Sequence, residues 1–151
     1  MAETTSKVNV EKSVGRIRKG LGLIPYMAYL GMEFVEGSEG YCKVALRFQK
    51  ENTTAADALH GGAIASLIDT TGAMAAWTTA ELGSPRYFGS TVGVNVNYLS
   101  AVIGQDAYAE ARVLKRGREI IYSDVKVTNA DGKLCAQGTV VYRIIDRGED
   151  A

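Results

Sequence analysis

The chain contains very little histidine and cysteine, the residues that build zinc sites and disulfide frameworks. Its 151 residues include one histidine and two cysteines, so a zinc site made of histidine and cysteine ligands is not expected. The cysteines, Cys42 and Cys135, lie far apart in strand-like segments. One disulfide between them is an open alternative, but two reduced thiols are the default expectation.

Net charge and long hydrophobic runs are also missing. The 17 basic and 17 acidic residues give a formal net charge of +0, which provides no overall attraction to nucleic acid or to an anionic membrane. No apolar run is long enough to span a bilayer, and the polar residues 1–13 lack the apolar core of a secretory signal. We therefore expect a cytoplasmic protein without a nucleic-acid or membrane partner.

The sequence does contain enough apolar material for one folded domain. Apolar residues make up 46% of the chain, which is too many for a disordered protein. We divide the chain into a partly helical N-terminal arm over residues 1–25, a main domain over residues 26–147 and a C-terminal tail over residues 148–151. A chain of this length can bury a real core within one such domain.

Apolar periodicity predicts two helices at the start of the chain and one long helix in its middle. The arm carries apolar residues at helical spacing, at Val10, Val14, Ile17 and Leu21. A short helix is expected over residues 26–30. The long helix is predicted over residues 61–82, followed by Gly83 and Pro85 as stop signals. It contains no lysine or arginine, so most of its sides should be buried.

The remaining segments alternate between apolar and polar residues, as half-buried strands do. Strands are predicted over residues 31–36, 41–48, 92–98, 105–114, 119–128 and 134–145. The residues Asn129-Ala130-Asp131-Gly132 are a strong hairpin signal between the last two strands. Two strands, a buried helix and four more strands indicate an α+β protein, in which consecutive hairpins form an antiparallel sheet that curls around one central helix.

One stretch combines groups that suit acyl transfer. Leu59-His60-Gly61-Gly62 opens the long helix, and Asp69 lies inside it. The first N–H groups of a helix lack intrahelical partners and stabilise developing negative charge. A carboxylate in an apolar helix is costly unless it has a task or a partner, and a packing or capping role for Asp69 is the simpler alternative. Together these groups indicate an oxyanion site and a carboxylate that acts on water.

These residues make the chain resemble the hotdog-fold acyl-CoA thioesterases of the phenylacetate-degradation (PaaI-like) type. The resemblance covers about residues 30–145 and rests on His60-Gly61-Gly62, the acid nine residues after His60, the segment 95–99 and the turn 115–118. It implies a hotdog fold, which is an antiparallel sheet wrapped around one long central helix. It also implies hydrolysis of acyl-CoA thioesters to free acid and coenzyme A. No cofactor is implied, because coenzyme A is part of the substrate.

The resemblance implies a catalytic role for several residues. Asp69 resembles the catalytic carboxylate, which activates water or attacks the thioester itself. Gly61 matches the glycine whose N–H binds the thioester oxygen, and His60 matches the histidine beside that oxygen. Thr91 falls where a serine or threonine helps to hold the water.

One position departs from the family pattern. Family members often carry asparagine or glutamine six residues before the histidine. In this chain that position is Thr54, and Asn52 lies two residues earlier. Either the loop shifts so that Asn52 serves, or this contact is absent. We keep Asn52 as a catalytic candidate.

Four residues are candidates for substrate binding. Gly62 lets an acyl group approach the backbone closely because it has no side chain. The turn residues Arg116, Gly117 and Arg118 are the others, since arginine suits the geometry of the phosphates of coenzyme A. A solvated hairpin tip is the alternative for this turn.

The spacing between His60 and Asp69 predicts assembly. Nine residues of helix rotate by about 900° and advance by ~13 Å, so the two side chains face opposite ways. One subunit cannot readily bring both to one thioester carbonyl, whereas two antiparallel helices from different subunits can. We therefore expect a homodimer or homotetramer with sites shared between subunits.

Two other functions stay open from the sequence. A hotdog dehydratase or hydratase would use the histidine and the acid to move a proton at the α or β carbon of an acyl thioester. A non-catalytic, acyl-CoA-binding oligomer would need neither group for chemistry. The helix start at His60 together with Asp69 fits hydrolysis best.

Overall fold

The N-terminal arm is helical over most of its length. The computed structural model describes residues 2–148, with side chains from residue 9 onward, so Met1 and residues 149–151 of the predicted tail lie outside the described residues. Helix α1 (Ala2–Gly20) is followed by a short 3-10 turn, η1 (Leu21–Leu23), and by helix α2 (Pro25–Leu30). Ile17 and Leu21 are buried, which confirms the apolar face that the spacing predicted.

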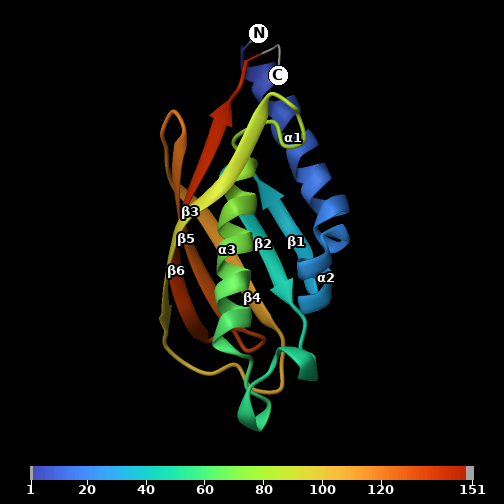
Figure 1. Ribbon diagram of the computed structural model, residues 1–151, viewed down its shortest axis with the longest axis vertical. Helices are drawn as coiled ribbons and strands as arrows, with labels where there is room; N and C mark the ends of the chain where they lie inside the picture. Colours follow the sequence, from blue (N-terminus) through green and yellow to red (C-terminus); the bar gives the residue numbers. More distant parts are fainter. Residues whose placement is uncertain (1, 149–151) are drawn as a thin grey trace.

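One antiparallel sheet of six strands forms the body of the molecule (Figure 1). The strands are β1 (Met32–Ser38), β2 (Tyr41–Leu46), β3 (Tyr87–Tyr98), β4 (Ala107–Arg116), β5 (Ile120–Asn129) and β6 (Leu134–Asp146). Their order across the sheet is β1-β2-β4-β5-β6-β3. All six predicted strands are present, but β3 does not form a hairpin with β4, and instead pairs with β6 at the far edge. It also begins at Tyr87, earlier than predicted.

Helix α3 (Gly61–Trp77) lies against one face of this sheet, and the sheet curves around it (Figure 1). Leu67, Ile68 and Ala75 are fully buried in the core between them. The helix approaches β6 so closely that a Cβ on Gly72 would lie 2.5 Å from Val140 Cγ2. This arrangement confirms the predicted hotdog fold.

Helix α3 is shorter than predicted, because it ends at Trp77 and not at residue 82. The hydroxyls of Thr78 and Thr79 donate to the carbonyls of Ala75 (2.6 Å) and Ala76 (2.7 Å). Such side-chain bonds to the backbone compete with continuation of a helix. Gly83 and Pro85 therefore lie in the loop that follows the helix and do not set its end.

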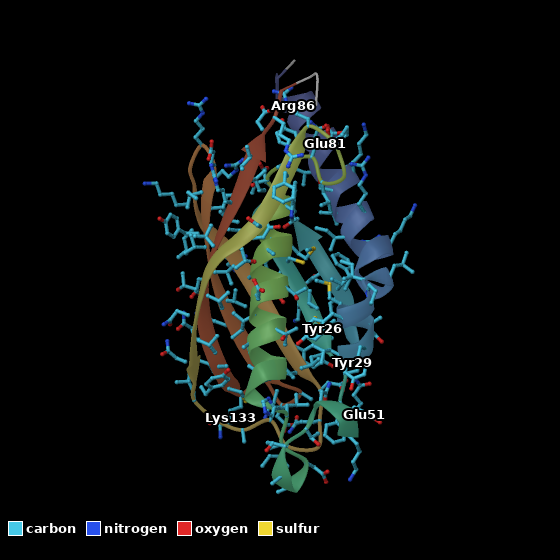
Figure 2. All side chains as sticks on the ribbon, viewed as in Figure 1. Tyr26, Tyr29, Glu51, Glu81, Arg86 and Lys133 are labelled. Carbon is cyan, nitrogen blue, oxygen red and sulfur yellow. The ribbon has the colours of Figure 1, made fainter. Side chains whose placement is uncertain are left out.

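One stripe of α3 is left uncovered. Gly62 is exposed and Ala65, Ser66 and Asp69 are half-buried, and these positions recur every three to four residues along one side of the helix. Tyr26 of α2 lies beside this stripe (Figure 2), and its hydroxyl is 3.0 Å from Ser66 Oγ. The prediction that most sides of the helix are buried holds for the rest of its surface.

The two cysteines are free and buried, as the default expectation held. Burial raises the pKa of the Cys42 thiol to about 12, so this thiol stays protonated and unreactive. Residues 2–148 contain no helix that is long and apolar enough to cross a lipid bilayer. Within the same range, no three His, Cys, Asp or Glu side chains gather where a metal ion could bind.

Candidate active site

His60 caps the first turn of α3. The Gly62 N–H donates to His60 Nδ1 (2.8 Å), and the N–H groups of Ala63 (2.9 Å) and Ile64 (3.1 Å) donate to the His60 carbonyl oxygen. Because Nδ1 accepts a hydrogen bond, the ring N–H of His60 is on Nε2. The ring is exposed, so this Nε2–H can donate to a bound substrate.

The Gly61 N–H is the remaining amide of that first turn. Among the described residues it has no hydrogen-bond acceptor, so it stays available at the positive end of the helix dipole. The Tyr98 hydroxyl fixes the same residue from the other side by donating to the Gly61 carbonyl oxygen (2.7 Å). One free N–H at a helix start, held in place by its neighbours, is the geometry that an oxyanion donor needs.

Asn52 contacts His60 through its backbone. Its carbonyl oxygen accepts from the His60 N–H (2.8 Å), and its Nδ2 donates to the carbonyls of Leu30 (3.0 Å) and Arg47 (3.3 Å). In the loop between Asn52 and His60, Ala56 and Asp57 both have a positive φ of 57°. The backbone of Asn52 therefore reaches the start of α3, while Thr54 lines a cavity together with Gly61.

The side-chain amide of Asn52 donates hydrogen bonds through Nδ2, but its Oδ1 accepts none from the described residues. Its Nδ2 ties together backbone segments that precede and follow β1 and β2. Its Oδ1 is buried and has no partner among the described residues. An unpaired buried acceptor of this kind is uncommon and costs stability unless a donor arrives.

Asp69 and Thr91 form the second part of the site. The Thr91 hydroxyl donates to Asp69 Oδ1 (2.7 Å), which links helix α3 to the edge strand β3. Among the described residues Asp69 Oδ2 has no hydrogen-bond partner. A half-buried carboxylate with one oxygen fixed and one free can accept a proton from water. The structure thus brings together the two residues that the resemblance placed around the water.

Tyr142 is a further residue of this region that the sequence analysis missed. It lies opposite Thr91 in the pairing of β3 with β6, and it is 7% exposed. The Trp77 Nε1–H donates to its hydroxyl oxygen (3.0 Å). Burial raises the pKa of Tyr142, the Trp77 bond opposes that shift, and the charge of Asp69 adds to it. In the sequence this tyrosine is indistinguishable from an ordinary core position of an alternating strand.

The predicted phosphate-binding residues lie at the opposite end of the molecule from Gly61. Figure 1 shows the connection from β4 to β5 at the upper end and the start of α3 at the lower end. Arg116 Nη1 donates to the carbonyls of Gly117 and Arg118, and Gly117 is needed because a Cβ there would lie 2.8 Å from the Ile120 oxygen. Within one subunit the structure does not bring this turn to His60 and Gly61.

The same turn borders a cavity of about 400 Å³, lined by Tyr87, Arg116, Arg118 and Asp146 among others. Partial burial lowers the pKa of the Arg116 guanidinium, although it remains charged at neutral pH. The turn is thus more than an open hairpin tip, because two guanidinium groups border a hollow.

Known proteins resemble this chain in sequence over the same region. The family description "Thioesterase superfamily" matches residues 57–136. Human acyl-coenzyme A thioesterase 13 is 39% identical over 106 residues, which cover 69% of this chain and 73% of that protein. A putative esterase from Archaeoglobus fulgidus is 33% identical over 118 residues, which cover 76% of this chain and 72% of the esterase.

Solved structures share the fold at lower identity. A thioesterase from Haemophilus influenzae superimposes with a TM-score of 0.79 at 20% identity, covering 90% of this chain and 92% of that one. The Escherichia coli PaaI protein from the phenylacetic acid degradation operon gives a TM-score of 0.78 at 19% identity, covering 89% and 94%. The family match contains the helix start at Gly61 as well as Asp69 and Thr91. This chain is therefore a hotdog-fold member of the thioesterase superfamily.

Proposed function

We propose that the protein hydrolyses acyl-CoA thioesters to a free acid and coenzyme A. The observation that carries this proposal is the single unpartnered N–H of Gly61 at the start of α3, on the same helix as the half-free carboxylate of Asp69. The names of the related acyl-coenzyme A thioesterases support the substrate class. The reaction needs no cofactor, because coenzyme A is part of the substrate.

The proposed chemistry uses water as the second substrate. Asp69 Oδ2 takes a proton from the water, and the oxygen of that water attacks the thioester carbon. The carbonyl oxygen becomes an oxyanion that the Gly61 N–H stabilises, an effect commonly worth about 100- to 1,000-fold in rate. The C–S bond then breaks as the oxyanion collapses, and the proton that Asp69 took from the water passes to the departing thiolate. His60 Nε2–H lies on the exposed side of the same helix start, where it can donate to the substrate.

We further propose that each site is shared between two subunits. Gly61 and Asp69 are eight residues apart on α3, which corresponds to about 12 Å along the helix axis. One carbonyl group and one attacking water do not span that distance. In two antiparallel copies of α3, Gly61 of one subunit approaches Asp69 of the other. The same arrangement brings the turn of Arg116 and Arg118 toward the partner's helix start.

The edge strand β3 offers a surface for this pairing. It is 12 residues long, and four of its large apolar side chains are 40–60% exposed, at Phe88, Val92, Val94 and Tyr98. A long apolar edge strand is a pairing site in soluble proteins. Antiparallel pairing of two β3 strands about a two-fold axis would continue the sheet and set the two α3 helices antiparallel on one face.

The experiment that tests this proposal removes one half of the site at a time. Gly61→Pro deletes the N–H, and proline is tolerated at the first helical position; His60 already has the extended conformation that a following proline requires. Gly61→Ala is the matched control, because it keeps the N–H. We expect Gly61→Pro and Asp69→Asn to be nearly inactive in thiol release from acyl-CoA.

Mixing the two variants tests whether the sites are shared. Refolding equal amounts of Gly61→Pro and Asp69→Asn together should restore about one quarter of the wild-type rate, because half of the dimers are mixed and each has one intact site. No recovery would assign the whole site to one subunit. A dehydratase would instead convert a 3-hydroxyacyl-CoA without releasing thiol, and a non-catalytic binder would do neither.

A further inference from the structure

Two hydrogen-bond chains converge on the start of α3, and each begins at the hydroxyl of a tyrosine. The first begins at Tyr98, the last residue of β3, whose hydroxyl donates to the Gly61 carbonyl oxygen (2.7 Å). The N–H of that same peptide group belongs to Gly62 and donates to His60 Nδ1 (2.8 Å). The first chain therefore ends at the Nε2–H of the exposed His60 ring.

The second chain begins at Tyr26 of α2, beside the uncovered stripe of α3 (Figure 2). The Ser66 hydroxyl donates to the Gly62 carbonyl oxygen (2.8 Å), which uses the only hydrogen that this hydroxyl has. In the 3.0 Å contact between the two hydroxyls, Tyr26 is therefore the donor and Ser66 the acceptor. Tyr26 thus acts on the Gly62 carbonyl through one serine.

Peptide groups pass a hydrogen bond on, because their C–N bond has partial double-bond character. A donor at the oxygen withdraws electrons from the nitrogen, so each bond in a chain strengthens the next by about 10–30%. The Gly62 carbonyl shares its peptide group with the Ala63 N–H, which donates to the His60 carbonyl oxygen (2.9 Å). That carbonyl shares its peptide group with the Gly61 N–H, where the second chain ends.

A bulge in β3 brings Tyr98 to the face of the sheet that carries α3. Thr91 and Tyr98 are seven residues apart, and this odd spacing would place them on opposite faces of a regular strand. The pairing of β3 with β6 shifts by one residue between Thr91 and Gly93, so both side chains face α3. The Tyr98 ring lies 3.4 Å from the position that a Cβ on Gly61 would take. One edge strand therefore holds both Asp69 and the helix start.

We propose that Tyr98 and Tyr26 are positioning residues for the two groups that donate to the thioester oxygen. The former acts through the His60 Nε2–H and the latter through the Gly61 N–H. This inference rests on the proposed function, because it takes these two groups as donors to a thioester. Both tyrosines strengthen hydrogen bonds to an oxygen whose negative charge develops in the transition state, so they should affect kcat more than KM.

Removing one hydroxyl at a time tests both chains. Tyr98→Phe and Tyr26→Phe keep the ring and should each lower kcat in thiol release by about three- to tenfold, the loss expected for one hydrogen bond between uncharged groups. KM should change by less than about twofold.

Two other tyrosines serve as matched controls. Tyr29 also lies exposed on α2, and Tyr122 lies exposed on β5. Neither hydroxyl has a hydrogen-bond partner among the described residues. Tyr29→Phe and Tyr122→Phe should therefore keep the wild-type kcat, so that a loss in the other two variants reports on the chains.

The ring of His60 gives a readout that does not depend on activity. The chain has one histidine, so ¹⁵N-labelled histidine reports on His60 alone. At alkaline pH, where histidine is neutral, the two ring nitrogens show which of them carries the proton. We expect the wild type to carry it on Nε2 and Tyr98→Phe to shift part of the population to Nδ1. Tyr26→Phe should leave this distribution unchanged.

Double variants show through which donor each tyrosine acts. In the His60→Asn background the imidazole is absent, so adding Tyr98→Phe should cost less than about twofold in kcat. Adding Tyr26→Phe to the same background should keep its full cost, because its chain runs through the backbone. An equal cost of Tyr98→Phe with and without the imidazole would overturn its route through His60.

The outcomes separate this inference from the function on which it rests. Wild-type kcat in both tyrosine variants of a protein that hydrolyses thioesters overturns the inference and leaves the function standing. A fall in kcat of Tyr98→Phe with an unchanged ring proton assigns Tyr98 to packing and overturns its role. A wild type that releases no thiol from any acyl-CoA refutes the function and the role of both tyrosines in catalysis, even where the ring proton of Tyr98→Phe moves as expected.

Discussion

The Thr91 hydroxyl donates a hydrogen bond to Asp69 Oδ1 over 2.7 Å and so joins the edge strand β3 to the central helix α3. The bond fixes one carboxylate oxygen and leaves the other free for water. Because β3 is also the strand that we propose pairs with a second copy, the orientation of Asp69 depends on the surface that would form the dimer. In the proposed dimer, assembly and chemistry would therefore be coupled through this pair of residues.

Replacing Asp69 by asparagine should remove the base while keeping the shape of the side chain. General-base help typically contributes about 100- to 10,000-fold in rate, so kcat of Asp69→Asn should fall by that range while the protein stays folded and oligomeric. Asp131→Asn is the matched control, since Asp131 lies exposed in a hairpin. Thiol release from Asp69→Asn at the wild-type rate would remove Asp69 from the mechanism, and loss of folding would assign it to helix packing.

Thr91 should act on the reaction through Asp69. Thr91→Val keeps the shape of the side chain but removes the hydroxyl, whereas Thr91→Ser keeps the hydroxyl. Hydrogen bonds to charged groups are worth about 1.5–3 kcal/mol, so kcat of Thr91→Val should fall by about 10- to 100-fold with little change in KM. Rescue by serine and not by valine distinguishes the hydrogen bond from simple packing of β3. A similar loss in both variants would point to packing alone.

The sequence predicted the parts of this fold that follow from local periodicity. Alternation of apolar and polar residues located the six strands, and the apolar segment after Gly61 located the central helix. The predicted end of that helix was wrong, because the helix ends where the side chains of Thr78 and Thr79 hydrogen-bond to backbone carbonyls, and no spacing rule reveals such bonds. The position of β3 at the edge of the sheet was also not predicted, because β3 pairs with β6, which is distant in the sequence, and such pairing leaves no local signal.

The candidate site was predictable only where a motif marked it. His60, Gly61 and Asp69 follow a pattern, and the structure places Thr91 on Asp69 as the resemblance implied. The places of Asn52 and Thr54 depended on a loop conformation that includes two residues with positive φ, and the sequence carries no local pattern for it. The distance of the Arg116 turn from Gly61 within one subunit could not be read from the sequence, because it depends on how the strands and the helix are arranged in space.

His60 has a structural role as a cap and a proposed chemical role through Nε2, and two substitutions separate them. His60→Ala removes the acceptor for the Gly62 N–H and should lower stability by about 1 kcal/mol. His60→Asn restores a capping side chain, because asparagine is a strong N-cap residue, but it does not restore the imidazole. We expect urea unfolding to show wild-type stability for His60→Asn, while thiol release stays low in both variants. Recovery of activity together with stability in His60→Asn would reduce His60 to a cap.

Arg116 and Arg118 should bind the phosphates of coenzyme A from the turn between β4 and β5. Arg118→Ala is the cleaner substitution, because Arg116 also donates to the carbonyls of its own turn. We expect Arg118→Ala to raise KM by about tenfold, which corresponds to ~1.4 kcal/mol, with kcat nearly unchanged. High salt should shrink the difference between variant and wild type, because exposed charges are screened. Lys126→Ala is the matched control, since it removes one exposed positive charge elsewhere on the sheet.

The substrate itself offers a second control for this prediction. An acyl thioester of dephospho-CoA lacks the 3′-phosphate and keeps the diphosphate. If Arg118 binds the 3′-phosphate, wild type and Arg118→Ala should have the same KM for the dephospho substrate, and wild type should lose as much on it as the variant does on acyl-CoA. If Arg118 binds the diphosphate, the tenfold difference should persist on both substrates. An unchanged KM for Arg118→Ala on both substrates would show that Arg118 is part of a solvated hairpin tip and does not bind coenzyme A.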